Sequence, residues 1–184
     1  MLIIAIIVIF ILMVFFYIVS GYNSLIRLRN QVKNAWSQID VQLKRRYDLI
    51  PNLMETVKGY MKHEKETLEN ITAARSRAMD AGNMHDKLAA EGELTNAIGR
   101  FLLVVENYPD LKADQSFALL QEELTATENK ISFSRQSYND SVYLFNNKIE
   151  MFPTNVLAAF FSFTKEEFFE IENPTEKNVP KVSF

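Results

Sequence analysis

Three short stretches of this 184-residue sequence are denser in polar and aromatic side chains than a plain helical protein needs. They are residues 45–53, 105–111 and 135–140. They combine guanidinium, carboxylate, amide and phenol groups, which can form ion pairs, cap helix ends and bind a partner. The residues of interest in and beside them are Trp36, Asp40, Arg45, Arg46, Tyr47, Pro51, Asn52, Glu106, Tyr108, Pro109, Arg135, Tyr138 and Asn139. The favoured interpretation is structural, with Asn52, Glu106 and Asp110 capping helix ends and Arg45 or Arg46 neutralising them.

The alternative interpretation of these stretches is functional. In it, exposed side chains around Arg45, Tyr47 and Tyr108 form a docking surface for a membrane partner. Substitutions at these positions would then abolish a co-purifying partner without unfolding the domain.

Signatures of catalysis and of metal or cofactor binding are absent from the sequence. Its two histidines, His63 and His85, stand neither in H-E-x-x-H nor three residues after a glutamate, and the glycine-rich phosphate-binding and nucleophile motifs are missing. Because there is no cysteine, thiolate metal sites and disulfides are excluded. The group Glu122, Glu123 and Glu128 suits a divalent cation by type, but a charged outer face is favoured. We predict no enzymatic activity, no cofactor and no metal.

The residues of interest follow an apolar stretch at the start of the chain. From Leu2 to Val19 there is no charged residue, and a helix of that length rises roughly 27 Å, close to the thickness of a bilayer core. A cleaved signal peptide is disfavoured, because no Lys or Arg precedes the run and no A-x-A cleavage pattern follows it. We predict an uncleaved membrane span.

Charge near the span predicts its orientation. Arg27, Arg29 and Lys33 follow the apolar run, and short Lys- and Arg-rich flanks stay in the cytoplasm. We therefore expect a single-pass protein of the bacterial inner membrane, with its N-terminus outside and its C-terminal domain in the cytoplasm. The basic half lies nearest the membrane, where anionic lipid headgroups are the expected partner. The net charge of −3 is not that of a nucleic-acid-binding protein.

The scarcity of turn-forming residues, 5 Gly and 5 Pro, predicts an all-helical fold. Apolar residues recur at helical spacing in four segments, which we expect to be helices. Their approximate ranges are 24–50, 52–80, 84–107 and 116–152. The last has the strongest pattern, because an apolar or aromatic residue stands at every seventh position from Phe117 to Phe152. Such a row requires a partner helix along its length.

Two prolines, Pro51 and Pro109, decide how these helices are arranged. If both are turns, the helices form an up-and-down antiparallel four-helix bundle with long coiled-coil-like helices. If both are kinks, the chain is one long hairpin that must oligomerise. We favour the bundle, with a transmembrane anchor at 1–22, a helical bundle domain at 23–153 and a tail at 154–184.

The bundle makes a testable prediction about its first and last helices. With these two antiparallel, Trp36 lies near Tyr138, and Asp40 lies at about the level of Arg135.

The C-terminal tail is rich in phenylalanine and then becomes polar, with Pro174 and Pro180. A short helix followed by an extended arm that covers the bundle end is favoured. An interfacial or oligomer-forming element is the alternative, because many Phe side chains on a short segment are unfavourable in water.

Four motifs in the sequence resemble those of one known family. They are Ala35-Trp36-Ser37-Gln38-Ile39-Asp40, the run L-K-R-R-Y-D-L-I-P-N-L at 43–53, the run E-N-Y-P-D-L-K-A at 106–113, and R-Q-S-Y-N-D at 135–140 with Phe152-Pro153. Together they resemble the LemA family of bacterial membrane proteins. The resemblance implies a single N-terminal span, a cytoplasmic helical domain and no established enzymatic activity.

Two roles are suggested by the family rather than by the residues. A magnetosome membrane protein among its members suggests membrane organisation, and frequent gene proximity to a membrane metalloprotease suggests envelope quality control. We expect a self-associating homo-oligomeric scaffold that organises or shapes the bacterial cytoplasmic membrane. The alternative is a regulatory adaptor for a membrane protein partner such as a protease or an envelope-stress sensor.

Overall fold

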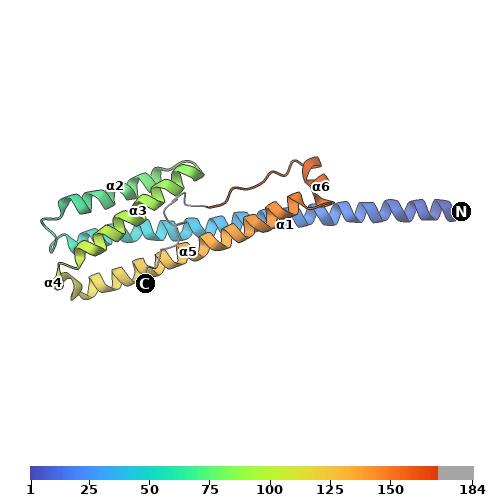
Figure 1. Ribbon diagram of the computed structural model, residues 1–184. Coiled ribbons are helices and arrows are strands. Elements are labelled where there is room, and N and C mark those ends of the chain that lie inside the picture. Colours follow the sequence, from blue (N-terminus) through green and yellow to red (C-terminus); the bar gives the residue numbers. More distant parts are fainter. Residues whose placement is uncertain (170–184) are drawn as a thin grey trace, which may run out of the picture. The chain divides into compact units, whose positions relative to one another are not determined.

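The computed structural model describes residues 1–169, and every regular element among them is a helix (Figure 1). This confirms the predicted all-helical class. By their internal packing, these residues separate into two compact units: unit 1 comprises 1–42 and 130–168, and unit 2 comprises 43–129 and Phe169. The helices are α1 (Leu2–Val57), α2 (Lys65–Asp80), α3 (Met84–Val105), α4 (Pro109–Lys112), α5 (Gln115–Glu150) and α6 (Thr154–Phe160).

The first part of α1 contains the apolar stretch for which the sequence predicts a membrane span. Within residues 1–169, α1 is the one helix long and apolar enough to cross a bilayer, with a mean hydropathy of 3.5 over its most apolar 18 residues. None of that window is buried against the rest of the protein. An uncovered apolar helix of this length is suited to lipid rather than to water, and it indicates association with a membrane.

Unit 1 is built where α1 leaves the apolar run. Its core is formed by α1 and the later part of α5, and the ring centroids of Trp36 and Tyr138 are 5.5 Å apart. This contact confirms the predicted neighbourhood of the two rings, whereas the common level of Asp40 and Arg135 stays a prediction. The buried side chains are Leu25, Val32, Ala35 and Ile39 from α1, with Ile131, Tyr138, Val142 and Phe145 from α5.

Unit 2 contains the end of α1, the beginning of α5, and α2, α3 and α4. Figure 1 shows α2 and α3 side by side, and these two helices make extensive contact. The rings of Phe101 and Phe117 meet edge to face with centroids 6.5 Å apart. The largest buried apolar side chains include Leu43, Ile50 and Leu53 from α1, Ile71 from α2, Leu94 and Phe101 from α3, and Phe117 from α5.

The predicted helix boundary at Pro51 is wrong, because α1 continues through this proline to Val57. Ile50, Leu53 and Val57 are buried and extend the apolar row of the preceding turns. Keeping this row on the core side outweighs the backbone hydrogen bond that a proline removes. The chain reverses later, in residues 58–64, and α2 begins at Lys65 rather than at Asn52.

The break at Pro109 is confirmed, and it has its own short helix. Pro109 is the first residue of α4, where a proline loses no helical hydrogen bond. After α4, the carboxylate of Asp114 accepts a hydrogen bond of 2.9 Å from the backbone N–H of Phe117. Asp114 therefore caps the beginning of α5.

The described part of the tail contains the predicted short helix, α6. After it, an extended segment is held against α5 by Asn146, whose side-chain amide donates to the carbonyl of Glu166 at 2.9 Å and accepts from its N–H at 3.0 Å. The hydroxyl of Tyr138 donates to the carbonyl of Glu167 at 2.9 Å. The predicted polar stretch with Pro174 and Pro180 lies outside the described residues.

Candidate functional site

The core of unit 2 holds a charged pair, Arg46 on α1 and Glu91 on α3, and neither side chain is exposed to solvent. One guanidinium nitrogen, Nη2, donates to the carboxylate of Glu91. The other, Nη1, donates to Thr95 Oγ1 at 2.9 Å and to Glu128 Oε1 at 2.5 Å. Arg46 therefore links α1 to both α3 and α5.

Tyr47 extends this cluster to α2. Its hydroxyl donates to the carboxylate of Glu91 and lies 3.3 Å from the carbonyl oxygen of Ala78. Its own carbonyl accepts a hydrogen bond of 2.7 Å from Nε of Arg75. The neighbouring positions 46 and 47 thus connect α1 to α2, α3 and α5 in unit 2.

The arrangement favours a structural role for this buried cluster. Desolvating two charges is unfavourable, and pairing with added hydrogen bonds to Thr95, Glu128 and Tyr47 compensates for it. The hydrogen bonds fix the direction of each buried group, so they favour one packing of the four helices over others. Within residues 1–169, no group of three or more His, Asp or Glu is arranged to hold a metal ion.

Two sequence-based interpretations of these residues need correction. Tyr47 is buried, so it cannot belong to an exposed docking surface with Arg45 and Tyr108. Arg45 is exposed and pairs with Glu123 at 2.5 Å, while Tyr108 is half-buried and donates to Glu64 Oε1 at 3.1 Å.

The predicted neutralisation of helix caps by arginine is also wrong. Arg45 and Arg46 pair with glutamates of α3 and α5, as described above. Glu106 pairs instead with Lys112 Nζ at 2.6 Å, on the surface. Pro51, Asn52 and Pro109 are exposed.

A polar cluster joins the loop after α1 to the beginning of α5. The hydroxyl of Tyr60 donates to Asp114 Oδ2 at 3.1 Å. This hydrogen bond and the negative charge of Asp114 raise the pKa of Tyr60. The N–H of Phe117 lowers the pKa of Asp114, because it stabilises the carboxylate. Burial raises the pKa of Tyr108, and its hydrogen bond to Glu64 adds to the effect.

The remaining residues of interest lie in unit 1. Trp36 and Asp40 on α1, and Arg135 and Asn139 on α5, are half-buried, and each interacts with other groups. Tyr138 is buried, and burial raises its pKa to about 12, with the charges of Glu166 and Glu167 adding to the effect. Tyr138 packs against Trp36 of α1, and its hydroxyl binds the extended segment after α6.

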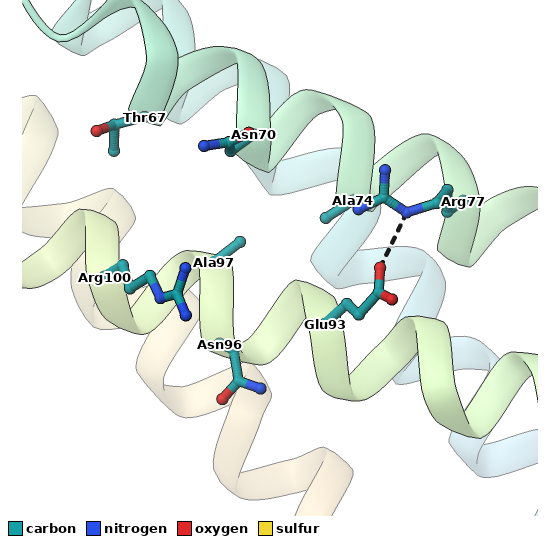
Figure 2. Close-up of a pocket in the computed structure, with 8 residues that line it drawn as sticks. All are labelled: Thr67, Asn70, Ala74, Arg77, Glu93, Asn96, Ala97 and Arg100. Carbon is teal, nitrogen blue, oxygen red and sulfur yellow. Dashed lines mark hydrogen bonds and ion pairs between the residues drawn. The ribbon is translucent and has the colours of Figure 1, made fainter.

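The sequence did not reveal a polar groove between α2 and α3, with a volume of about 410 Å³ (Figure 2). An ion pair of 2.9 Å between Arg77 Nε and Glu93 Oε2 crosses it. Figure 2 shows polar side chains from both helices along its length. It is lined by Thr67, Asn70, Ala74, Arg77, Glu93, Asn96, Ala97 and Arg100.

Comparison with known proteins gives a consistent result. A family model described as LemA family matches residues 35–184. Protein LemA of Metamycoplasma hominis is 31% identical over 145 residues, which cover 78% of this chain and 66% of that protein. Magnetosome protein MamQ 2 of Paramagnetospirillum magneticum is 24% identical over 175 residues, and magnetosome protein MamQ of Magnetospirillum gryphiswaldense is 22% identical over 174 residues.

These matches cover most of this chain but a smaller share of each relative. The matches to the magnetosome proteins cover 81% and 80% of this chain and 64% of each relative. The chain therefore spans slightly less than two thirds of the length of the relatives it matches. None of these three relatives carries the name of an enzyme.

Proposed function

The chain belongs to the LemA family, and from that premise we propose that it is a non-enzymatic, single-pass scaffold that self-associates and organises the bacterial cytoplasmic membrane. Its N-terminus lies outside, and its helical units lie in the cytoplasm. The basic residues Arg27, Arg29 and Lys33, directly after the span, support this orientation. We also propose that α1, α2, α3 and α5 are the four helices of an up-and-down bundle.

The observation that carries this proposal is the continuity of α1. One helix contains the uncovered apolar residues up to Val19 and then, from Leu25 onward, contributes buried residues to the core of unit 1. There is no flexible linker between the two parts. Whatever unit 1 binds is therefore held close to the bilayer, as a membrane-organising protein requires. Relatives that carry the name magnetosome protein add support to a role at membranes.

The surface for self-association differs from the one that the heptad row of α5 indicates. From Phe117 to Phe145 this row is buried inside the chain, so it has no free side for a second copy. Other apolar side chains of α5 in unit 1 stay uncovered, among them Phe133 and Leu144. They lie eleven positions apart on α5, about three helical turns, so they share one face. We assign self-association to this face.

The test is the mass of the full-length protein in lipid nanodiscs, measured by native mass spectrometry. We expect a defined oligomer, and we expect the double variant Phe133→Ser/Leu144→Ser to be monomeric. Met79→Ser is a matched control, because Met79 is an exposed apolar residue of α2 in unit 2. A wild-type protein that stays monomeric at every concentration would refute the scaffold.

A second candidate function is a regulatory adaptor for a membrane protease or envelope-stress partner. The groove between α2 and α3 favours it, because Asn70, Asn96 and Arg100 offer hydrogen-bond donors along an open polar surface. Its test is in-cell cross-linking to such a partner through a photoreactive residue at position 96. Equal cross-linking by wild type and by Asn70→Ala/Arg100→Ala would exclude the groove as the binding site.

A further inference from the structure

The turn between α5 and α6 presents an uncovered apolar surface that the scaffold does not use. We call it the aromatic corner and define it by Met151, Phe152, Val156 and Phe160. Phe152 and Phe160 are 82% and 79% exposed, and Met151 and Val156 are also exposed. From 151 to 163 the chain contains no charged residue. Side chains of this size and number are unfavourable in water, so the corner requires an apolar partner.

The packing of α6 places this corner beside the end of the membrane span. Leu157 on the buried side of α6 fits against Gly21 of α1, where a Cβ atom would lie 2.6 Å from Leu157 Cδ1. The ring of Phe161 contacts that of Tyr22 with centroids 4.7 Å apart. Gly21 is two residues beyond Val19, the last residue of the apolar run, which is about 3 Å along the helix axis.

The helical spacing separates the two sides of α6. Thr154, Leu157 and Ala158 are buried against the rest of unit 1. Val156 and Phe160 stand four positions apart and lie on the uncovered side of α6, and Phe152 in the turn before it is exposed as well. Both sides of α6 are therefore apolar, one packed against unit 1 and the other uncovered. A helix of this kind is suited to a protein core on one side and lipid on the other.

The order of residue types along α1 supports lipid as the occupant. The apolar run is followed by Tyr22 and then by Arg27 and Arg29, and aromatic rings followed by basic groups are typical of a membrane–water interface. Arg29 lies over the ring of Phe163 with 5.3 Å between its Cζ atom and the ring centroid. Because α6 is attached within this zone, its uncovered rings lie at the same depth.

From these observations we propose that the aromatic corner inserts into the interfacial layer of the bilayer that α1 crosses, as a second membrane attachment of unit 1. The proposal rests on the membrane anchoring in the proposed function, but not on self-association. A second copy of the chain or another protein at the corner is a competing outcome that the experiment separates.

Site-directed spin labelling tests the insertion, and the absence of native cysteine makes single labels unambiguous. Full-length Phe160→Cys is labelled with a nitroxide and reconstituted in vesicles of phosphatidylcholine and phosphatidylglycerol. Accessibility to oxygen, which concentrates in lipid, is compared with accessibility to a water-soluble nickel complex. Phe10→Cys in the apolar run is the lipid reference, and Val41→Cys, 62% exposed on α1 and outside the face assigned to self-association, is the aqueous reference. Phe152→Cys is an independent second probe.

We expect the oxygen-to-nickel ratio at positions 160 and 152 to rise from the aqueous value toward that of position 10. A ratio at both positions equal to that of position 41 would overturn the proposal while leaving the anchor intact. Low accessibility to both reagents, with spectral broadening that grows with protein-to-lipid ratio, would also overturn it and assign the corner to a second copy. An aqueous ratio at position 10 would instead refute the anchor.

Discussion

The guanidinium of Arg46 and the carboxylate of Glu91 are paired in the core of unit 2, and neither is exposed to solvent. Replacing Glu91 removes the fully buried partner of Arg46 and leaves its guanidinium with Glu128 and Thr95 alone. We expect Glu91→Ala to lower the free energy of unfolding by about 3 kcal/mol, the lower end of the range for a broken buried pair, because Glu128 still compensates part of the charge. Urea denaturation of the full-length protein in detergent, followed by circular dichroism, measures this change.

Two controls distinguish the buried pair from charge in general. Glu123→Ala removes the partner of the exposed Arg45 and should cost less than about 1 kcal/mol. The double variant Arg46→Met/Glu91→Met replaces the pair by apolar side chains and should recover most of the stability lost in Glu91→Ala. If Glu91→Ala were as stable as Glu123→Ala, the buried pair would not hold unit 2 together.

Because of Tyr138, the stability of unit 1 depends on pH in the alkaline range. Its pKa rises from 10.0 to about 12 in the folded protein, so the unfolded chain loses this proton first. The resulting stabilisation is complete below pH 10.0 and is lost as pH rises through about 12. We expect Tyr138→Phe to remove this part of the decrease in melting temperature, which thermal scans over that pH range can measure.

The same substitution has a separate effect at neutral pH. Tyr138→Phe removes the hydrogen bond to the carbonyl of Glu167 and should cost about 1 kcal/mol. Tyr143→Phe is the matched control, because Tyr143 is an exposed tyrosine of α5. Identical alkaline transitions in wild type and Tyr138→Phe would contradict the assignment.

Asp114 gives the opposite pH dependence. Because its pKa is lowered in the folded protein, its stabilising effect is present above its ordinary pKa and is lost as pH falls through the lowered value. We expect Asp114→Ala to lower the melting temperature at neutral pH and to reduce the acid-induced loss of stability. Asp114→Asn should retain most of the cap, because the amide oxygen can still accept from Phe117 N–H. Equal melting temperatures for Asp114→Ala and wild type would exclude the cap.

Gly21 is the contact point of α6 on α1. Replacing a helical glycine by alanine usually stabilises by roughly 0.5–1 kcal/mol, and Gly99→Ala should do so because nothing lies within 4 Å of its added Cβ. Gly21→Ala should gain less, since Leu157 must move, and Gly21→Leu should displace α6. Hydrogen exchange of the amides of 154–160 measures the displacement. Protection that is unchanged in Gly21→Leu would contradict the contact.

The sequence predicted the position of a helix correctly where its apolar pattern allowed only one interpretation. The apolar run, the range of α3 and the heptad row of α5 each have a single regular spacing, and the structure follows them. The contact between Trp36 and Tyr138 follows from the antiparallel register of the two helices. Pro51 was misleading, because its local preference to end a helix is weaker than the burial of Ile50, Leu53 and Val57 around it.

The buried charge cluster has a signal in the sequence: charged residues stand at core positions of two helices. Glu91 stands seven positions before Ile98 on the apolar stripe of α3, and Arg46 stands seven positions after Ile39 and seven before Leu53 on the apolar stripe of α1. A charged residue at a core position requires an opposite charge on a facing helix. The groove between α2 and α3 had no such signal, because its polar residues match any solvated helix face.

The unbroken path of α1 from Val19 to Gln42 has a mechanical consequence. An unbroken helix turns as one rigid body, because backbone hydrogen bonds connect each turn to the next. Rotating the apolar part about its axis therefore rotates Trp36 by the same angle. Torque applied to the span by a neighbouring protein, or by a change in bilayer thickness, is therefore delivered to the core of unit 1 without loss in a hinge. The proposed membrane anchor is then also a rigid mechanical connection to unit 1.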